Sequence, residues 1–203
     1  ANALTGRRLP MLDRIEIAII EENQPRWLAF LNGELDLLDE LPAEFADLAI
    51  PNNVLAPNLR KRGIHMLRYA RSDVSLSYFN MEDPVVGGYT PDKVALRRAI
   101  SLATDVDKEI RLVRHNQAIP GQSHIAPGVW GYDPAFKSEM SDFDPARAKA
   151  LLDLYGYVDK NGDGWRDQPD GSPLVLHYAT QPDRASRSLV ELWQKNMDAI
   201  GIR

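Results

Sequence analysis

The sequence predicts an α/β fold with mixed sheets, because segments with two different apolar spacings alternate along the chain. Residues 13–20, DRIEIAII, place Ile15, Ile17 and Ile19 on one face, and this alternation is typical of a strand. Residues 144–156, DPARAKALLDLYG, begin with an aspartate cap and a proline and end with a glycine, which is typical of a helix. Alternating strands and helices favour a layered α/β architecture.

The first half of the chain is expected to contain short elements. Pro25 begins a helix that Gly33 ends, since proline suits the first helical turn and glycine the position after the last. Trp27, inside this helix, has the spacing of a packing residue. The other expected elements are a strand at 33–38, a helix at 42–50, a partly helical polar connection at 51–63, and strands at 63–69 and 74–80.

The second half is expected to be richer in helices. Thr90 caps a helix over 90–105, with Pro91 at its first position. Residues 116–143 mix scattered apolar residues with glycines and prolines, which indicates a long ordered loop, and such loops are commonly functional. The remaining expected elements are a helix at 106–115, the helix at 144–156, a strand at 172–180, and a helix at 184–201 in which Trp193 is a packing residue.

The composition is that of an ordinary globular protein. Of its 203 residues, 44% are hydrophobic and 26% charged, and the net charge of −5 argues against a nucleic-acid partner, because such binders usually carry a basic face. No apolar run approaches the roughly 20 residues that cross a bilayer, so the chain is not expected to span a membrane. Any export signal is expected to have been removed or to lie upstream. The lack of cysteine excludes disulfides and thiolate chemistry.

The sequence contains none of the motifs that would predict an enzyme. It has no G-x-S-x-G, no phosphate-binding loop, no G-x-G-x-x-G and no H-E-x-x-H. The histidines, at positions 65, 115, 124 and 177, lack metal-ligand spacing and are expected to be structural or surface residues. Lys93, Arg97 and Arg98 are expected to form a solvated helix face or to pair with neighbouring acids. No catalytic residue, cofactor or metal ligand is therefore predicted.

One stretch leaves a second function open. Residues 159–170, DKNGDGWRDQPD, place oxygen-bearing side chains at EF-hand positions, with Gly164 at the sixth. An EF-hand also needs a second helix and usually a glutamate at the twelfth position, where this chain has Asp170 followed by a predicted strand. A polar turn is therefore favoured. The alternative is a calcium-binding structural or adhesive module that uses the Asp159–Asp170 loop.

Five blocks of the sequence, in order, resemble one family, the bacterial extracellular solute-binding proteins of the peptide and nickel ABC transporter type (family 5). The first block is LPMLDRIEIAII with NGELDLL, and the second is SYFN followed by VALRRAISLATDVDKEI. HIAPGVWGYDP, DPARAKALLDLYGYVDKNGDG and the closing helix that ends in AIGIR resemble the later blocks. The resemblance runs from about Leu9 to Arg203. Thr104 and Val106 depart from it, because the family prefers isoleucine and arginine there.

The resemblance implies a periplasmic-binding-protein-like two-lobe fold that this chain covers only in part. Residues 1–73 would belong to the first lobe, on its hinge side, and residues 74–203 to the second, because such chains cross between lobes near the SYFN segment. The implied function is the solute-binding component of an ABC importer, which captures peptides or similar small solutes in the cleft and delivers them to the membrane permease. The implied protein is a monomer, periplasmic or lipid-anchored on the outer cell surface.

Four residues are expected to contact the solute. Trp130 and Tyr132 lie on the long loop and would supply aromatic walls, although packing of Trp130 on the core of its own lobe is the alternative. Asn80 ends the crossing segment and could hydrogen-bond either the solute or the hinge backbone. Gln181 follows the segment 173–180 and is a weaker candidate of the same kind, since ligands favour the carboxyl ends of strands.

Overall fold

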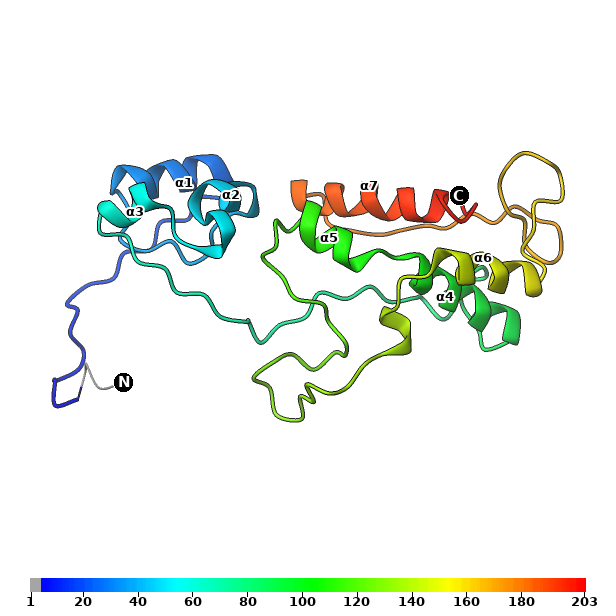
Figure 1. Ribbon diagram of the computed structural model, residues 1–203, viewed down its shortest axis with the longest axis horizontal. Coiled ribbons are helices and arrows are strands. Elements are labelled where there is room, and N and C mark those ends of the chain that lie inside the picture. Colours follow the sequence, from blue (N-terminus) through cyan, green and yellow to red (C-terminus); the bar gives the residue numbers. More distant parts are fainter. Residues whose placement is uncertain (1–4) are drawn as a thin grey trace. The chain divides into compact units, whose positions relative to one another are not determined.

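The computed structural model describes residues 5–203, apart from the side chains of Met140 and Arg184. The chain divides into two compact units, Ala1–Phe45 and Ala46–Arg203, whose elements are coloured along the sequence in Figure 1. This division lies ahead of the expected lobe boundary between residues 73 and 74, which stays a prediction.

The first unit is organised around helix α1, Asn23–Asn32, with the short 3-10 helix η2 at Ala43–Phe45. Trp27 is buried and stacks on Phe30 at 6.0 Å and on Phe45 at 5.6 Å between ring centroids. Gly33 ends the helix with a φ of 78°, a conformation that costs glycine little. The predicted packing of Trp27 and the predicted end at Gly33 are confirmed, but the helix begins at Asn23, before Pro25.

The second unit begins with three short helices. They are α2 at Ala46–Ala49, the 3-10 helix η3 at Pro51–Asn53, and α3 at Pro57–Lys61. Pro51 and Pro57 each stand in a first turn, where a missing N–H has no cost. The helix predicted at 42–50 is present as η2 followed by α2, and the partly helical character predicted for residues 51–63 is confirmed.

The main core of this unit is helical. Helix α4, Pro91–Ala103, packs against α6, Pro145–Leu154, and α7, Arg184–Asp198. The short helices α5, Val106–Leu112, and η4, Glu139–Ser141, complete the set (Figure 1). The buried apolar residues come from α4, α6, α7 and the segments that flank them: Leu96, Ala99, Ile100, Leu102, Ala103, Ala148, Leu152, Tyr157, Leu174, Met197, Ile200 and Ile202. Trp193 packs on this core, as predicted.

Aspartate caps begin three of these helices. Asp105, Asp144 and Asp183 each accept a hydrogen bond from a backbone N–H in the first turn, at 2.9, 2.9 and 3.0 Å. This geometry satisfies helix donors that have no partner within the helix. Thr90 occupies the cap position of α4 as predicted, but its side chain bonds no helix amide. Its hydroxyl instead hydrogen-bonds the Asp92 carboxylate and lowers the pKa of Asp92.

The mixed sheets that the sequence predicts are not formed by the described residues. The five expected strands are irregular in residues 5–203, and the only pairing is an isolated antiparallel bridge between Asp167 and Pro173. Alternating apolar residues show that an extended segment can present one apolar face. A strand also requires a neighbouring strand with which its backbone N–H and C=O groups form hydrogen bonds. Ile17 in the first expected strand is 85% exposed, so no partner covers that face here.

Candidate functional site

Loop 116–143 is held in shape by its own polar side chains. The Oε1 atom of Gln122 accepts hydrogen bonds from the Ser138 backbone N–H at 3.0 Å and from the Ser141 hydroxyl at 2.7 Å. Gln122 therefore ties the first part of the loop to its last part. At the exit, the Asp144 N–H donates to a carbonyl near the end of α4 at 2.8 Å. The prediction of a long ordered loop is confirmed, and its closed base is typical of a functional surface loop.

The loop presents two aromatic side chains. Trp130 is 99% exposed, so it does not pack on a core within its unit, and Tyr132 is 39% exposed. Gly131 between them has a φ of 89°, a conformation that a residue with a side chain rarely adopts, and it forms the turn that brings both rings to the surface. An indole in water leaves a large apolar area uncovered, which a bound molecule could bury.

The other two predicted contacts belong to two further segments: Asn80 ends residues 74–80, and Gln181 follows residues 173–180. Residues 74–80 lead toward α4 and residues 173–180 toward α7, so they run in opposite directions in Figure 1. The hydroxyls of Ser77 and Tyr178, 3.3 Å apart, join the two segments. Asn80 and Gln181 therefore lie toward opposite ends of this pairing. The structure places Trp130 and Tyr132 in one turn, whereas it separates Asn80 from Gln181.

Asn80 already has a local role. Its Oδ1 accepts a hydrogen bond from the Glu82 N–H at 3.1 Å, and its carbonyl accepts one from the Asp83 N–H at 3.1 Å. This arrangement is an asparagine turn, and it agrees with the alternative in which Asn80 hydrogen-bonds the local backbone rather than the solute. The Asn80 amide nitrogen is exposed with the rest of the side chain and can still donate to a solute.

An aromatic pair that the sequence did not single out as a site stands beside these segments. The rings of Tyr178 and Trp193 are 4.7 Å apart and inclined by 35°. Trp193 continues into the core, while Tyr178 is 38% exposed. The pair thus extends the core to the surface where residues 74–80 and 173–180 meet. Tyr178 lies in the alternating segment 172–180, but nothing in the sequence pairs it with Ser77.

The turn at residues 81–88, directly after Asn80, is clamped by α4. Lys93 Nζ donates to two carbonyls of the turn at 2.8 and 2.9 Å, and Arg97 Nη1 donates to two others at 2.7 and 2.8 Å. Asp83 accepts N–H groups of Val86 and Val85, which lower the pKa of its carboxyl. The prediction of a solvated or acid-paired face is wrong for Lys93 and Arg97, because the turn folds over them.

The Asp159–Asp170 loop uses its oxygens on its own backbone. Asp159 accepts the N–H groups of Gly162 at 2.7 Å and Gly164 at 2.9 Å, and these bonds, with that of Gly164 foremost, lower its pKa. Asp163 accepts the Trp165 N–H at 2.8 Å. No helix follows, since the chain returns through the bridge at Asp167. These contacts support the polar turn, and nothing in the structure favours the calcium-binding alternative.

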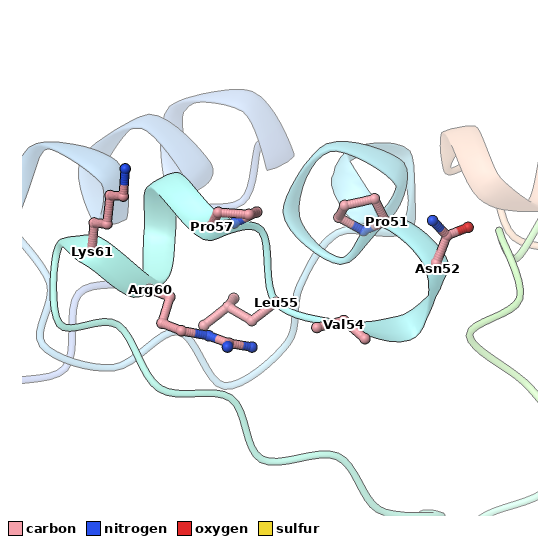
Figure 2. Close-up of a pocket in the computed structure, with 7 residues that line it drawn as sticks. All are labelled: Pro51, Asn52, Val54, Leu55, Pro57, Arg60 and Lys61. Carbon is pink, nitrogen blue, oxygen red and sulfur yellow. The ribbon is translucent and has the colours of Figure 1, made fainter.

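An open hollow of about 490 Å³ lies beside η3 and α3 (Figure 2). Its lining consists of Pro51, Asn52, Val54, Leu55, Pro57, Arg60 and Lys61. The walls are mainly apolar, and Figure 2 shows Arg60 and Leu55 among the lining side chains. None of the four predicted contacts lines it, so the hollow and the aromatic loop are separate features of the unit.

Exposed aromatic side chains on an ordered loop are suited to binding a molecule rather than to group transfer. The family model for bacterial extracellular solute-binding proteins, family 5 Middle, matches residues 5–203. The chain therefore belongs to this family of binding proteins. Within residues 5–203, no helix combines the length and the apolarity that crossing a membrane requires.

Individual relatives agree with this assignment. A probable ABC transporter-binding protein of Deinococcus radiodurans is 24% identical over 200 residues, which are 98% of this chain and 33% of the relative. The oligopeptide-binding protein AppA of Bacillus subtilis, solved with a nonapeptide, superposes with a TM-score of 0.64 at 19% identity, over 91% of this chain and 34% of its own. NikA of Brucella suis, solved with Fe(III)-EDTA, has a TM-score of 0.62 at 24% identity, over 92% of this chain and 35% of its own. The chain thus shares the fold of binding proteins and spans about a third of their length.

Proposed function

We propose that this chain belongs to the solute-binding component of an ABC importer that captures peptides or similar small solutes. The family match over residues 5–203 is the observation that carries the proposal. It is supported by the similarity to AppA, which was solved with a nonapeptide. The solute would lie in a cleft between two lobes, one containing residues 1–73 and the other residues 74–203.

The exposed aromatic loop would form one wall of that cleft. Trp130 and Tyr132 supply flat apolar surfaces that accept side chains of many shapes, as a binder of varied peptides requires. The Asn80 amide and the Gln181 side chain would add hydrogen bonds to the solute backbone. Such a site needs no cofactor, because it binds and releases the solute unchanged.

The partners follow from the same function. A captured solute must pass to a membrane permease, so the binding protein would work in the periplasm or anchored by lipid on the outer cell surface. It would act as a monomer that docks with the permease subunits. The calcium-dependent module is not proposed, because the oxygens of the Asp159–Asp170 loop are engaged by backbone N–H groups.

Native mass spectrometry of the purified protein tests the proposal, since a bound peptide appears as an added mass. Isothermal titration with a panel of di- to pentapeptides then measures affinity. Trp130→Ala should weaken binding at least tenfold, whereas Phe136→Ala, a control on the same loop with a 49% exposed side chain, should change it less than threefold. No added mass and no heat with any peptide would contradict the proposed function.

A further inference from the structure

Four described residues other than glycine have a positive φ, and they form two turns. Asn52 and Asn53 have φ values of 53° and 63°, and His115 and Asn116 have values of 46° and 60°. Side chains disfavour this region of the backbone map, and histidine enters it less readily than glycine does. Such conformations persist where surrounding contacts hold them, and they gather at functional sites. Each turn contains two consecutive residues in this conformation, so contacts with other residues are expected to hold each turn in place.

Arg68 links the two turns. Arg68 Nη1 donates to Asn53 Oδ1 at 2.6 Å, and Arg68 Nη2 donates to the Asn116 carbonyl at 2.9 Å. His115 Nδ1 lies 3.2 Å from Asp47 Oδ2. One guanidinium thus holds both turns through charge-assisted hydrogen bonds, whose planar geometry fixes their relative position. We call Asp47, Asn53, Arg68, His115 and Asn116 the turn anchor.

The turn anchor lies at the first residue of loop 116–143. The Asn116 N–H donates to the Ile110 carbonyl of α5 at 2.9 Å, so the same residue is also bonded to that helix. Further along, the loop lies against the segment that follows Arg68. A Cβ atom at Gly121 would lie 3.7 Å from Val74 Cγ1, and one at Gly128 would lie 3.6 Å from Ser72 Oγ. The loop is therefore held at its start by the turn anchor and along its length by residues 72–74.

We propose that Arg68 is a positioning residue, which fixes the base of loop 116–143 and so determines where Trp130 and Tyr132 are presented. Its bonds join residues on both sides of the expected lobe boundary, since Asn53 precedes residue 73 and Asn116 follows it. The consequence for solute binding rests on the proposed function. The anchoring itself is independent of any solute.

Hydrogen exchange measured by mass spectrometry tests the anchoring directly. In Arg68→Met, amides of residues 116–121 should exchange at least tenfold faster, while those of α4 and α6 keep their rates. Arg68→Lys restores the charge but only one of the two bonds, so its rates should lie between those of Arg68→Met and the unmodified protein. Arg60→Met removes an equal charge from α3 and is the matched control, for which no change is expected.

A fluorescence measurement reports on the presented ring. Subtracting the emission of a Trp130→Phe variant isolates Trp130, and its anisotropy should fall in Arg68→Met but not in Arg60→Met. If Arg68→Met does not fold, Asn53→Ala replaces it, because this change removes one acceptor and leaves the arginine in place. Unchanged exchange at residues 116–121, or an equal rise in α4 and α6, would overturn the proposal. Failure of the peptide titration alone would instead reject the proposed function and leave the anchoring established.

Discussion

Replacing Arg166 with methionine is expected to lower the free energy of unfolding by about 4 kcal/mol. The Arg166 side chain is only 13% exposed. Its Nε donates to the Ile200 carbonyl at 2.7 Å, and its Nη1 donates to the Tyr157 carbonyl and to Asp153. One guanidinium thus joins α6, the residues after it and the residues that follow α7.

The magnitude follows from what the substitution leaves behind. Methionine keeps the packing of the aliphatic stem but donates nothing, so the carbonyls of Ile200 and Tyr157, in residues that are 1% and 0% exposed, lose their charged donor. Each buried acceptor left without a partner costs about 1–3 kcal/mol. The pair with Asp153, whose side chain is 60% exposed, adds at most about 1 kcal/mol. Two carbonyls therefore account for most of the loss.

Urea unfolding followed by circular dichroism measures this difference. Asp153→Asn separates the ion pair from the carbonyl bonds, and it should cost less than about 1 kcal/mol because that carboxylate is largely solvated. Arg147→Met, on the exposed side of α6, controls for loss of a positive charge and should stay within about 0.5 kcal/mol of the unmodified protein. If Arg166→Met also stayed within about 1 kcal/mol, the carbonyl bonds would not stabilise this core.

Three further predictions concern other parts of the second unit. Gly87→Ala should destabilise it by about 2 kcal/mol or more in a thermal melt, since the added Cβ would lie 2.4 Å from the Met81 carbonyl oxygen, and an unchanged Tm would refute the close contact. Burial, followed by the charge of Asp92, raises the pKa of Tyr157 to about 12, so the folded state holds this proton more tightly than the unfolded state does. The resulting stability is present below pH 10 and is lost as pH rises from 10 to 12. Over this range the free energy of unfolding should fall by about 2–3 kcal/mol more than that of Tyr157→Phe. Parallel plots of unfolding free energy against pH for the two proteins would contradict the raised pKa. A chelator should leave the Tm unchanged, because the Asp159–Asp170 loop bonds its own backbone, and a large fall in Tm reversed by calcium alone would show a bound ion.

Part of the candidate site could be predicted from residue type and spacing. Trp130 and Tyr132 stand next to a glycine on a loop rich in turn residues, and this placed both as candidate contacts. The sequence left exposure and core packing of Trp130 open, and the structure has the exposed arrangement. The roles of Gln122 and Arg68 could not be predicted, because their partners lie 15 to 48 residues away and nothing in the local sequence specifies them. A glutamine and an arginine have the same local signature whether they bond a distant loop or water.

The sequence by itself determined the main helices and several of their ends. Asp144, Gly33 and the apolar spacing of α4 act within one or two turns of backbone, so neighbouring residues contain all the information that these features need. Only the tertiary structure decided the rest. It folded the turn at 81–88 over Lys93 and Arg97, and it left the alternating segments without a ladder in the described residues. A strand and a partly buried cation each depend on a partner beyond the neighbouring turn of the chain, and local spacing does not encode that partner.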